Sequence, residues 1–363
     1  MRALEQYWYS SRLGWHPLYD LALPFASLFY RLGQSIDSRL KANRAKTLPR
    51  PVISIGNLTV GGTGKTPLAV WLANQSIQLG KIPCVLTRGY GGSSQDPKRV
   101  EETEQNWETV GDEPLLLARS IPTGAVYIGK DRWQAGQLAL EEEPQIDVFI
   151  LDDGFQHRQL KRDADILLVD GLRRFGNGQV LPAGPLREPL SAASRATHIG
   201  VVTKSGSEVV EPFQPLPRLD FSLNLGPVGW RLLGENSVVS LESLPRENRV
   251  QLVSGIAAPD GFEKTADKLG LTIAGHSIYP DHHPYKISEI EAERESASRE
   301  GARLLTTAKD AVRMEGLPID WTPTDRPFII ELGVNPGDGA GYLVQVLKGV
   351  LGLQGSGLES DNP

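Results

Sequence analysis

The sequence predicts an α/β fold, in which a mostly parallel sheet carries helices on both faces and a β hinge joins it to a second, smaller α/β domain. Apolar runs of strand length recur along the 363 residues, and stretches of helix or loop length separate them. The chain contains 40% hydrophobic and 23% charged residues, which is typical of a soluble α/β protein. Such alternation favours parallel strands covered by helices.

The first segment, residues 1–48, is basic and aromatic. Residues 1–50 carry eight Lys or Arg and three Asp or Glu, a net charge of +5 in a chain whose total is −6. A membrane-spanning helix needs about 20 mostly apolar residues, but residues 13–32 include His16, Asp20 and two prolines. We therefore expect a helical segment that lies on an anionic membrane surface. The alternative is a pair of helices packed on its own domain.

A strand over residues 51–57 is followed by a glycine-rich loop and a helix over residues 65–80. The loop fits the GGxGK[ST] variant of a phosphate-binding loop, in which backbone N–H groups surround an anion, the lysine reaches the terminal phosphates and the threonine hydroxyl binds Mg²⁺. This pattern predicts a P-loop NTPase-like core over residues 49–212, and a glycine-rich turn without a ligand is the alternative. The predicted nucleotide contacts are Thr59, Gly61, Gly62, Thr63, Gly64, Lys65 and Thr66.

More strands are expected in this core, at residues 82–89, 147–153, 165–171 and 198–204. One of them ends in Asp152 and Asp153, at the carboxyl end of a strand, where α/β sheets bind their ligands. In a protein with a phosphate-binding loop, a carboxylate at this place organises the Mg²⁺ shell. A plain Asp-Asp-Gly turn is the alternative.

Two other charged clusters have the chemistry for phosphoryl transfer. Asp112 opens a helix-like segment, and its carboxylate either caps that helix or accepts the proton of an attacking hydroxyl. In the loop over residues 181–196, Arg187 and Glu188 offer a cation for phosphate and a carboxylate for a metal ion. Arg88 is a similar guanidinium at the end of a strand. Solvated turns are the alternative for both loops.

The second half of the chain is predicted to form a hinge and a smaller domain. The hinge, residues 213–245, contains a β hairpin that turns near Gly234. The smaller domain covers residues 246–350, and residues 351–363 have the composition of a flexible tail. The strands predicted in this domain lie at residues 250–257, 271–280, 303–310 and 327–334.

The cysteine and histidine residues limit which disulfide and metal sites the chain can form. Cys84 is the one cysteine, which excludes a disulfide framework and favours a reducing compartment. The Asp281-His282-His283 segment lacks further Cys or His ligands at zinc spacing. A histidine of this segment that reaches across a cleft between the domains and orients an acidic base would be more useful to a kinase than a zinc site. The segment from Thr306 to Asp310 lines the same cleft or starts a helix.

Eight segments, in this order, resemble the tetraacyldisaccharide 4'-kinase family: GNLTVGGTGKTP, TRGYGG, VGDEPLLLA, LDDGFQH, LPAGPLREP, SGIAAP, YPDHHPY and LLTTAKDAV. The resemblance covers about residues 50–333. It implies transfer of the ATP γ-phosphate to the 4'-hydroxyl of a tetraacylated glucosamine disaccharide 1-phosphate, in lipid A biosynthesis at the cytoplasmic face of the bacterial inner membrane. It implies ATP and Mg²⁺ as cofactors and a glycolipid and the anionic membrane surface as partners, with no nucleic acid and no obligate protein partner.

The resemblance also implies roles for single residues. The implied catalytic residues are Asp112 as the base, His282 as its partner, Lys65, Asp152 and Asp153. The implied metal ligands are Thr66, Asp153 and Glu188, and the expected substrate contacts are Asn57, Arg88, Tyr90 and Arg187. A membrane-attached nucleotide switch that acts on a protein partner is the alternative from another class, and a kinase or ligase for a soluble small molecule is a third.

Overall fold

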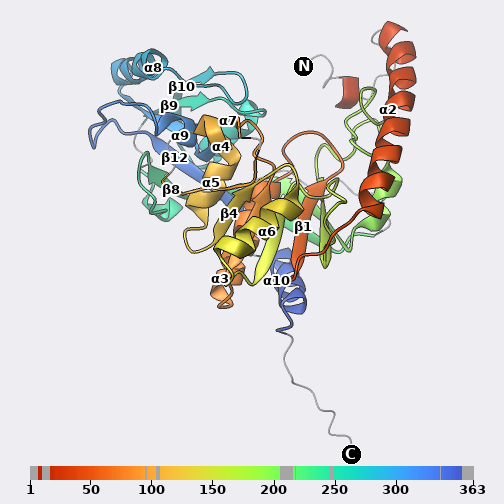
Figure 1. Cartoon of the computed structure of the whole chain (residues 1–363). Helices are drawn as coiled ribbons and strands as arrows, with labels where there is room; N and C mark the ends of the chain where they lie inside the picture. Colours follow the sequence, from red (N-terminus) through yellow and green to blue (C-terminus); the bar gives the residue numbers. More distant parts are fainter. Residues whose placement is uncertain are drawn as a thin grey trace, which may run out of the picture.

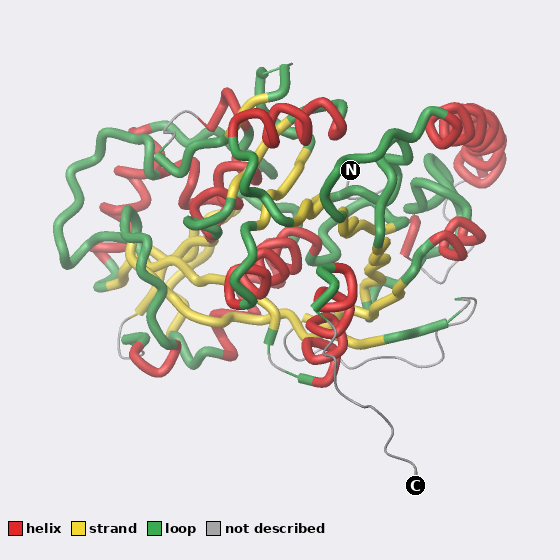
Figure 2. The backbone as a smooth tube through the Cα atoms, turned by 60° about the horizontal axis from the view of Figure 1, so that its bottom comes forward, coloured by secondary structure: helices red, strands yellow, loops and turns green. Residues whose placement is uncertain are grey.

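The computed structural model describes residues 7–9, 17–94, 96–103, 107–204, 216, 218–245, 249–335 and 337–353. Its strands form one twelve-stranded sheet in the order β10-β9-β11-β12-β8-β7-β6-β1-β5-β2-β4-β3. Seen from below, these strands run across the molecule from one half to the other (Figure 2). The predicted α/β class is confirmed.

The elements fall close to the predicted ones. The strands are β1 Val52–Asn57, β2 Pro83–Thr87, β3 Lys98–Arg99, β4 Ala125–Ile128, β5 Val148–Asp152, β6 Ala164–Asp170, β7 His198–Lys204, β8 Phe221–Leu232, β9 Arg249–Ser254, β10 Thr272–Ile278, β11 Ala302–Thr307 and β12 Phe328–Val334. The helices are α2 Pro17–Asn43, α3 Lys65–Gln78, α4 Trp107–Val110, α5 Asp112–Ser120, α6 Arg132–Glu142, α7 Pro259–Lys268, α8 Ile287–Arg299, α9 Ala308–Met314 and α10 Asp338–Val350. The expected strand over residues 82–89 is β2, and β3 and β4 were not predicted.

The centre of the sheet is β1, which pairs in parallel with β5 on one side and β6 on the other. Every residue of β1 is buried, as expected for a central parallel strand. Ile55 lies opposite Asp152 in the ladder between β1 and β5. Because the glycine-rich loop follows β1 directly, this register brings the loop beside Asp152 and Asp153.

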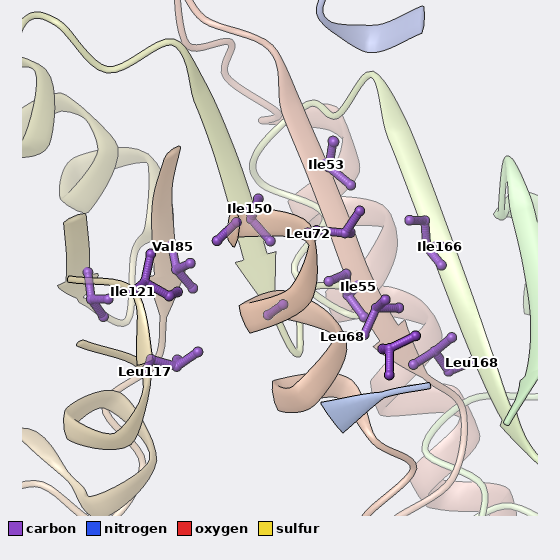
Figure 3. Packing of buried hydrophobic residues seen from close by; sticks show 14 of the residues in the cluster. Ile53, Ile55, Leu68, Leu72, Val85, Leu117, Ile121, Ile150, Ile166 and Leu168 are labelled. Atoms are coloured by element: carbon purple, nitrogen blue, oxygen red, sulfur yellow. The ribbon is translucent and has the colours of Figure 1, made fainter. Parts of the chain in front are cut away.

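The helix after the loop is fixed by apolar packing. Leu68 and Leu72 of α3 lie over Ile53 and Ile55 of β1 and beside Ile150 of β5 (Figure 3). All five side chains are at most 1% exposed, and burying each one stabilises the fold by about 1.5–3 kcal/mol. The start of α3 is therefore held against the sheet by buried apolar contacts.

The two halves of the molecule share β8. Its first residues, Phe221–Leu225, pair in parallel with β7, and its remainder pairs antiparallel with β12. The predicted hairpin is present only as one antiparallel bridge between Trp230 and Val239. Residues 205–215 and 217, which cover the end of the predicted core and the start of the expected hinge, lie outside the described residues.

The division into domains stays a prediction, but one helix departs from it. Residues 338–350 were assigned to the second domain, whereas α10 packs on α3 and β8. Leu343 and Leu347 of α10 belong to the same buried cluster as Ile53 and Leu68. The physical reason is that α3 exposes an apolar face that the first half alone does not cover. Most of the expected tail, residues 354–363, lies outside the described residues.

Helix α2 stands at the side of the molecule and extends beyond it (Figure 1). Large apolar side chains line its exposed face: Phe25, Leu28, Phe29, Leu32, Ile36 and Leu40. Its inner face uses small polar groups, since the buried Ser27 donates to the carbonyl of Val180 and accepts from the amide of Ala183. In the part of the chain that the structure describes, no helix is long and apolar enough to cross a membrane.

Candidate active site

The glycine-rich loop has the backbone of an anion-binding loop. Gly61 and Gly64 have φ values of 107° and 86°, in the region that favours glycine. A Cβ on Gly64 would lie 2.0 Å from Leu225 Cδ1, so a side chain here would require Leu225 to move and the residue to adopt an unfavourable φ. Helix α3 begins at Lys65 with no side-chain hydrogen bond at its cap. Its first N–H groups are therefore available to a phosphate.

Lys65 is held at the mouth of this loop. Its ammonium donates to Asn57 Oδ1 at 3.2 Å and lies 3.6 Å from Asp153 Oδ1. Asn57 was predicted to contact the substrate, but it is 0% exposed. Its second contact is with the carbonyl of Gly61, at 3.5 Å. The structure thus gives Asn57 a different place, behind the loop, where it orients Lys65.

Asp152 is a buried carboxylate with an incomplete set of partners. Oδ2 accepts from the hydroxyl of Thr66 at 3.1 Å, whereas Oδ1 is buried and has no hydrogen-bond partner among the described residues. Burial, followed by the charges of Glu113 and Asp153, raises the pKa of Asp152 to about 7. A cation bound beside Asp152 would offset the free-energy cost of ionising this buried carboxyl group. A hard cation with oxygen ligands, such as Mg²⁺, fits this donor set.

The described residues contain no group of three or more His, Cys, Asp or Glu side chains that is arranged to hold a metal ion. Mg²⁺ commonly binds through one or two carboxylates together with substrate phosphates and water. Asp152 and Thr66 match that type of site. They would share the ion with a bound nucleotide.

Asp153 and Glu188 are occupied by arginines. Both oxygens of Asp153 accept from Arg187, at 3.0 and 2.8 Å. Burial opposes its ionised form, but Lys65 and Arg187 outweigh burial and lower the pKa of Asp153. Both oxygens of Glu188 accept from Arg195, at 2.8 and 3.1 Å. The geometry therefore favours Asp152 over both of these predicted metal ligands.

The expected pairing of Asp112 with His282 is present across the two halves. Nδ1 of His282 lies 2.8 Å from Oδ2 of Asp112, although 170 positions separate the residues. Asp112 is the first residue of α5 and accepts the amide of Glu113 at 2.9 Å. Gly111, not Asp112, is the N-cap of α5, so the capping alternative is wrong, and the role of Asp112 as the base stays a prediction.

The protonation states of this pair follow from the charges around it. Burial opposes ionisation of Asp112, but its hydrogen bond to His282 and the charges of His282, Arg313 and Lys309 outweigh burial, so its pKa is lowered. The same hydrogen bond raises the pKa of His282. At neutral pH, Asp112 is therefore an ionised carboxylate that can accept a proton.

Ion pairs between α5 and α9 connect the halves around this pair. Glu113 pairs with Lys309, and Arg119 pairs with Glu315. Helix α9 begins at Ala308, with the hydroxyl of Thr307 accepting from the amide of Asp310. The segment from Thr306 to Asp310 thus starts a helix and also supplies Lys309 to the cleft.

Two predicted substrate contacts lie on the open side of the pair. Tyr90 is 66% exposed, and its ring centroid is 5.9 Å from that of His282. Arg88 is exposed in the same loop. A Cβ on Gly111 would lie 2.4 Å from the carbonyl oxygen of Tyr90, so this loop packs closely on the start of α5.

Sequence reasoning missed Arg132, the first residue of α6. Arg132 is 4% exposed, and its Nε has no hydrogen-bond partner among the described residues. Burial lowers its pKa to about 10, against the opposing charges of Asp153 and Asp152. A guanidinium held beside these carboxylates is suited to phosphate. The available signal was its position just after β4, at the edge of the sheet where ligands bind.

The comparisons with known proteins agree with this geometry. A family model described as tetraacyldisaccharide-1-P 4'-kinase matches residues 19–335. A tetraacyldisaccharide 4'-kinase of Pelobacter propionicus is 41% identical, over 83% of this chain and 84% of its own length, and one of Geobacter sulfurreducens is 41% identical over 82% of each.

A solved structure of LpxK from Aquifex aeolicus, in complex with ATP, superposes with a TM-score of 0.72 at 32% identity and covers 90% of this chain and 98% of that one. Its likeness extends over both halves of the molecule. The chain belongs to the tetraacyldisaccharide-1-P 4'-kinase family.

Proposed function

We propose that the protein transfers the γ-phosphate of ATP to the 4'-hydroxyl of tetraacyldisaccharide 1-phosphate, a step of lipid A biosynthesis. Family membership supports this function over a nucleotide switch. The observation that carries the mechanism is the contact between Asp112 and His282, which completes an acceptor for a proton only when the two halves meet. Glu113, the neighbour of Asp112, also raises the pKa of Asp152, so the two carboxylates belong to one site.

The P-loop half binds the nucleotide in this proposal. The backbone of residues 61–64 and the start of α3 surround the phosphates, and the ammonium of Lys65 neutralises their charge. Asp152 and Thr66 would hold Mg²⁺, which would neutralise phosphate charge when bound. Arg132 is a further cation at the transferred phosphate.

The second half completes the proton transfer. The ionised Asp112 accepts the proton of the sugar hydroxyl as the bond to phosphorus forms, and His282 keeps the carboxylate in place. Meeting of the halves also excludes water, which favours transfer to the sugar over hydrolysis of ATP. Tyr90 and Arg88, exposed beside this pair, contact the lipid headgroup.

The membrane part of the proposal rests on α2. Its exposed apolar face lies flat on the cytoplasmic surface of the bacterial inner membrane, where the acyl chains of the substrate reside. Replacing Phe25 and Phe29 by Ser should lower the fraction of protein that sediments with anionic vesicles several-fold. Leu332→Ser, at a site 54% exposed on β12, is the matched control and should sediment like the wild type. Equal sedimentation of all three proteins would contradict this role of α2.

The function itself is tested with purified protein, γ-labelled ATP, Mg²⁺ and the tetraacyl disaccharide 1-phosphate in detergent. We expect label in the lipid and little ATP consumption without the lipid. A protein that binds ATP but labels no lipid would disprove the proposed reaction. Rapid ATP hydrolysis that ignores the lipid would instead support the switch.

A further inference from the structure

We propose that Arg313 is a positioning residue for the reaction, because its guanidinium holds both Asp112 and the loop that carries His282. This inference rests on the proposed function. Arg313 lies in the middle of α9, has a side chain that is 0% exposed, and points from the second half toward α5 of the first half. No local sequence pattern marks it.

The contact with Asp112 is direct. Nε of Arg313 lies 3.6 Å from Oδ2 of Asp112, the oxygen that also faces His282. The Arg313 guanidinium and the His282 ring, both from the second half, therefore meet one carboxylate oxygen of the first half. A carboxylate that is 2% exposed needs such partners to stay ionised.

The contact with His282 runs through the backbone. Nη1 of Arg313 donates to the carbonyl of His283 at 3.3 Å, and Nη2 donates to the carbonyl of Gly255 at 2.9 Å. The carbonyl of Gly255 also accepts the amide of His282, at 3.1 Å. His282 has a φ of 58°, an unfavourable conformation for a residue other than glycine. The guanidinium is thus one of the groups that keep this strained residue in place.

Asp310 fixes the arginine in turn. It is 0% exposed and accepts from Nη2 of Arg313 at 2.5 Å. Its oxygens also accept from the amide of Gly255 and the hydroxyl of Tyr285, both at 2.8 Å, and from the hydroxyl of Thr307. Asp310, Arg313, Asp112 and His282 therefore form a row of alternating charge that ends at the base. A row of this kind is costly to bury unless every member is paired.

Lys309 and Asp281 are two further charged groups near this pair. Lys309, also on α9, lowers the pKa of Asp112 but forms its ion pair with Glu113. Asp281 lies 3.9 Å from Nε2 of His282 and acts on that ring rather than on Asp112. Arg313 is therefore the cation besides His282 that reaches the carboxylate of Asp112.

The test compares Arg313→Met and Arg313→Lys at saturating MgATP and lipid. We expect Arg313→Met to lower kcat at least tenfold with the KM for ATP changed less than threefold. The acidic limb of the pH profile of kcat should move to higher pH by about one pH unit, because Asp112 loses a cation that favours its ionised form. Arg313→Lys keeps the charge, so the acidic limb of its pH profile should stay near that of the wild type. Its kcat should lie between those of Arg313→Met and the wild type.

Arg231→Met is the matched control. Arg231 is 6% exposed and pairs with Glu315 and Glu331, so its loss disturbs the same half of the molecule without touching Asp112. Arg231→Met should lower stability and leave the acidic limb unmoved. If Arg313→Met and Arg231→Met give the same limb, Arg313 has a structural role only and the proposal is wrong.

A second measurement does not depend on activity. The ring of His282 can be titrated by NMR in the wild type and in Arg313→Lys, Arg313→Met and Asp310→Asn. Loss of the Arg313 cation should raise the pKa of His282, and Asp310→Asn, which removes a negative charge from the row, should lower it. Unchanged titration in both Arg313→Met and Asp310→Asn would overturn the proposal even if no lipid is phosphorylated, whereas an inactive wild type with the expected shifts would refute only the kinase function.

Discussion

Asp112 and Asp152 are equally buried carboxylates, at 2% and 3% exposure, yet their pKa values move in opposite directions. Asp112 faces His282, Arg313 and Lys309, and these charges outweigh the cost of burial. Asp152 faces the negative Glu113 and Asp153, and one of its oxygens has no partner in the described structure. Burial alone therefore does not decide the protonation state of these carboxylates. The fold supplies the counter-charge for Asp112, whereas Asp152 would receive its counter-charge from a ligand.

In the proposed reaction, this difference suits two separate tasks, although both carboxylates belong to the first half. The proposed base must be ionised before the acceptor arrives, and the second half supplies its basic partners from α9 and the loop after β10. The proposed metal ligand beside the P-loop instead keeps one oxygen without a partner among the described residues. Each carboxylate thus has the surroundings that its proposed part in phosphoryl transfer requires.

The largest effect is expected from replacing Asp112, whose carboxylate has its partners in the folded protein. Asp112→Asn should lower kcat by about 10²–10⁴-fold, because the amide cannot accept the proton of the hydroxyl. The amide still fits beside His282, so the circular dichroism spectrum should stay close to the wild type, whereas the midpoint of thermal unfolding should fall because the buried Arg313 loses one counter-charge. Initial rates at saturating substrates give the comparison. Near-normal turnover in a folded Asp112→Asn protein would remove Asp112 as the base.

The second largest effect is expected from Asp152, on the stability of the protein without ligands. The pKa of Asp152 is about 7 in the folded state, above the value of about 3.9 in an unfolded chain. The folded state therefore binds more protons, and its stability should fall as the pH rises from about 4 to 7, by at most about 4 kcal/mol. Asp152→Asn should remove this fall.

Urea unfolding at pH 5 and pH 8 measures this effect. The ligand-free wild type should be less stable at pH 8 than at pH 5, and Asp152→Asn should be the more stable protein at pH 8. Addition of MgATP should narrow the difference in the wild type only. A wild type as stable at pH 8 as at pH 5 would show that Asp152 carries no such cost.

A smaller effect is expected from His282. Its pKa in the folded state is raised above the usual 6.5, first by the hydrogen bond to Asp112. The stability it contributes is therefore fully present below about pH 6.5 and is lost as the pH rises through the folded value. His282 is partly exposed, so the contribution is below about 1 kcal/mol.

The measurement is the difference in unfolding free energy between the wild type and His282→Gln, which should be larger at pH 6 than at pH 9. His198→Gln is the control, because burial lowers the pKa of His198. Its difference from the wild type should change with pH in the opposite sense. A His282→Gln difference that is independent of pH would place the histidine outside the ion pair.

The two carboxylate sites also differ in how far the sequence predicted them. The loop before Lys65 and the pair Asp152-Asp153 are local patterns at strand ends, so their elements and their proximity were predictable. The contact between Asp112 and His282 joins distant segments and followed from family resemblance. Arg313 was missed because it lies inside a helix and acts through a contact that only the packing of α9 on α5 creates.

The burial of single residues was less predictable than the positions of the elements. Asn57 was expected to contact the substrate on the basis of the family resemblance, but its side chain is 0% exposed. Glu188 looked like a metal ligand, but Arg195, seven positions later, takes both of its oxygens. Both outcomes depend on side-chain packing, which a strand or turn pattern does not specify.

The smallest expected effect concerns Glu113, which follows Asp112 in the sequence and influences the pKa of Asp152. Glu113 raises the pKa of Asp152 and pairs with Lys309, so Glu113→Gln should lower the pKa of Asp152. The fall in stability of the ligand-free protein should then end at a lower pH, by less than one pH unit, and be smaller in total in the same urea series. Glu113 and Lys309 are each about one-third exposed, so the lost ion pair itself costs less than about 1 kcal/mol. A pH midpoint that stays in place, or moves upward, would mean that burial alone sets the charge state of Asp152.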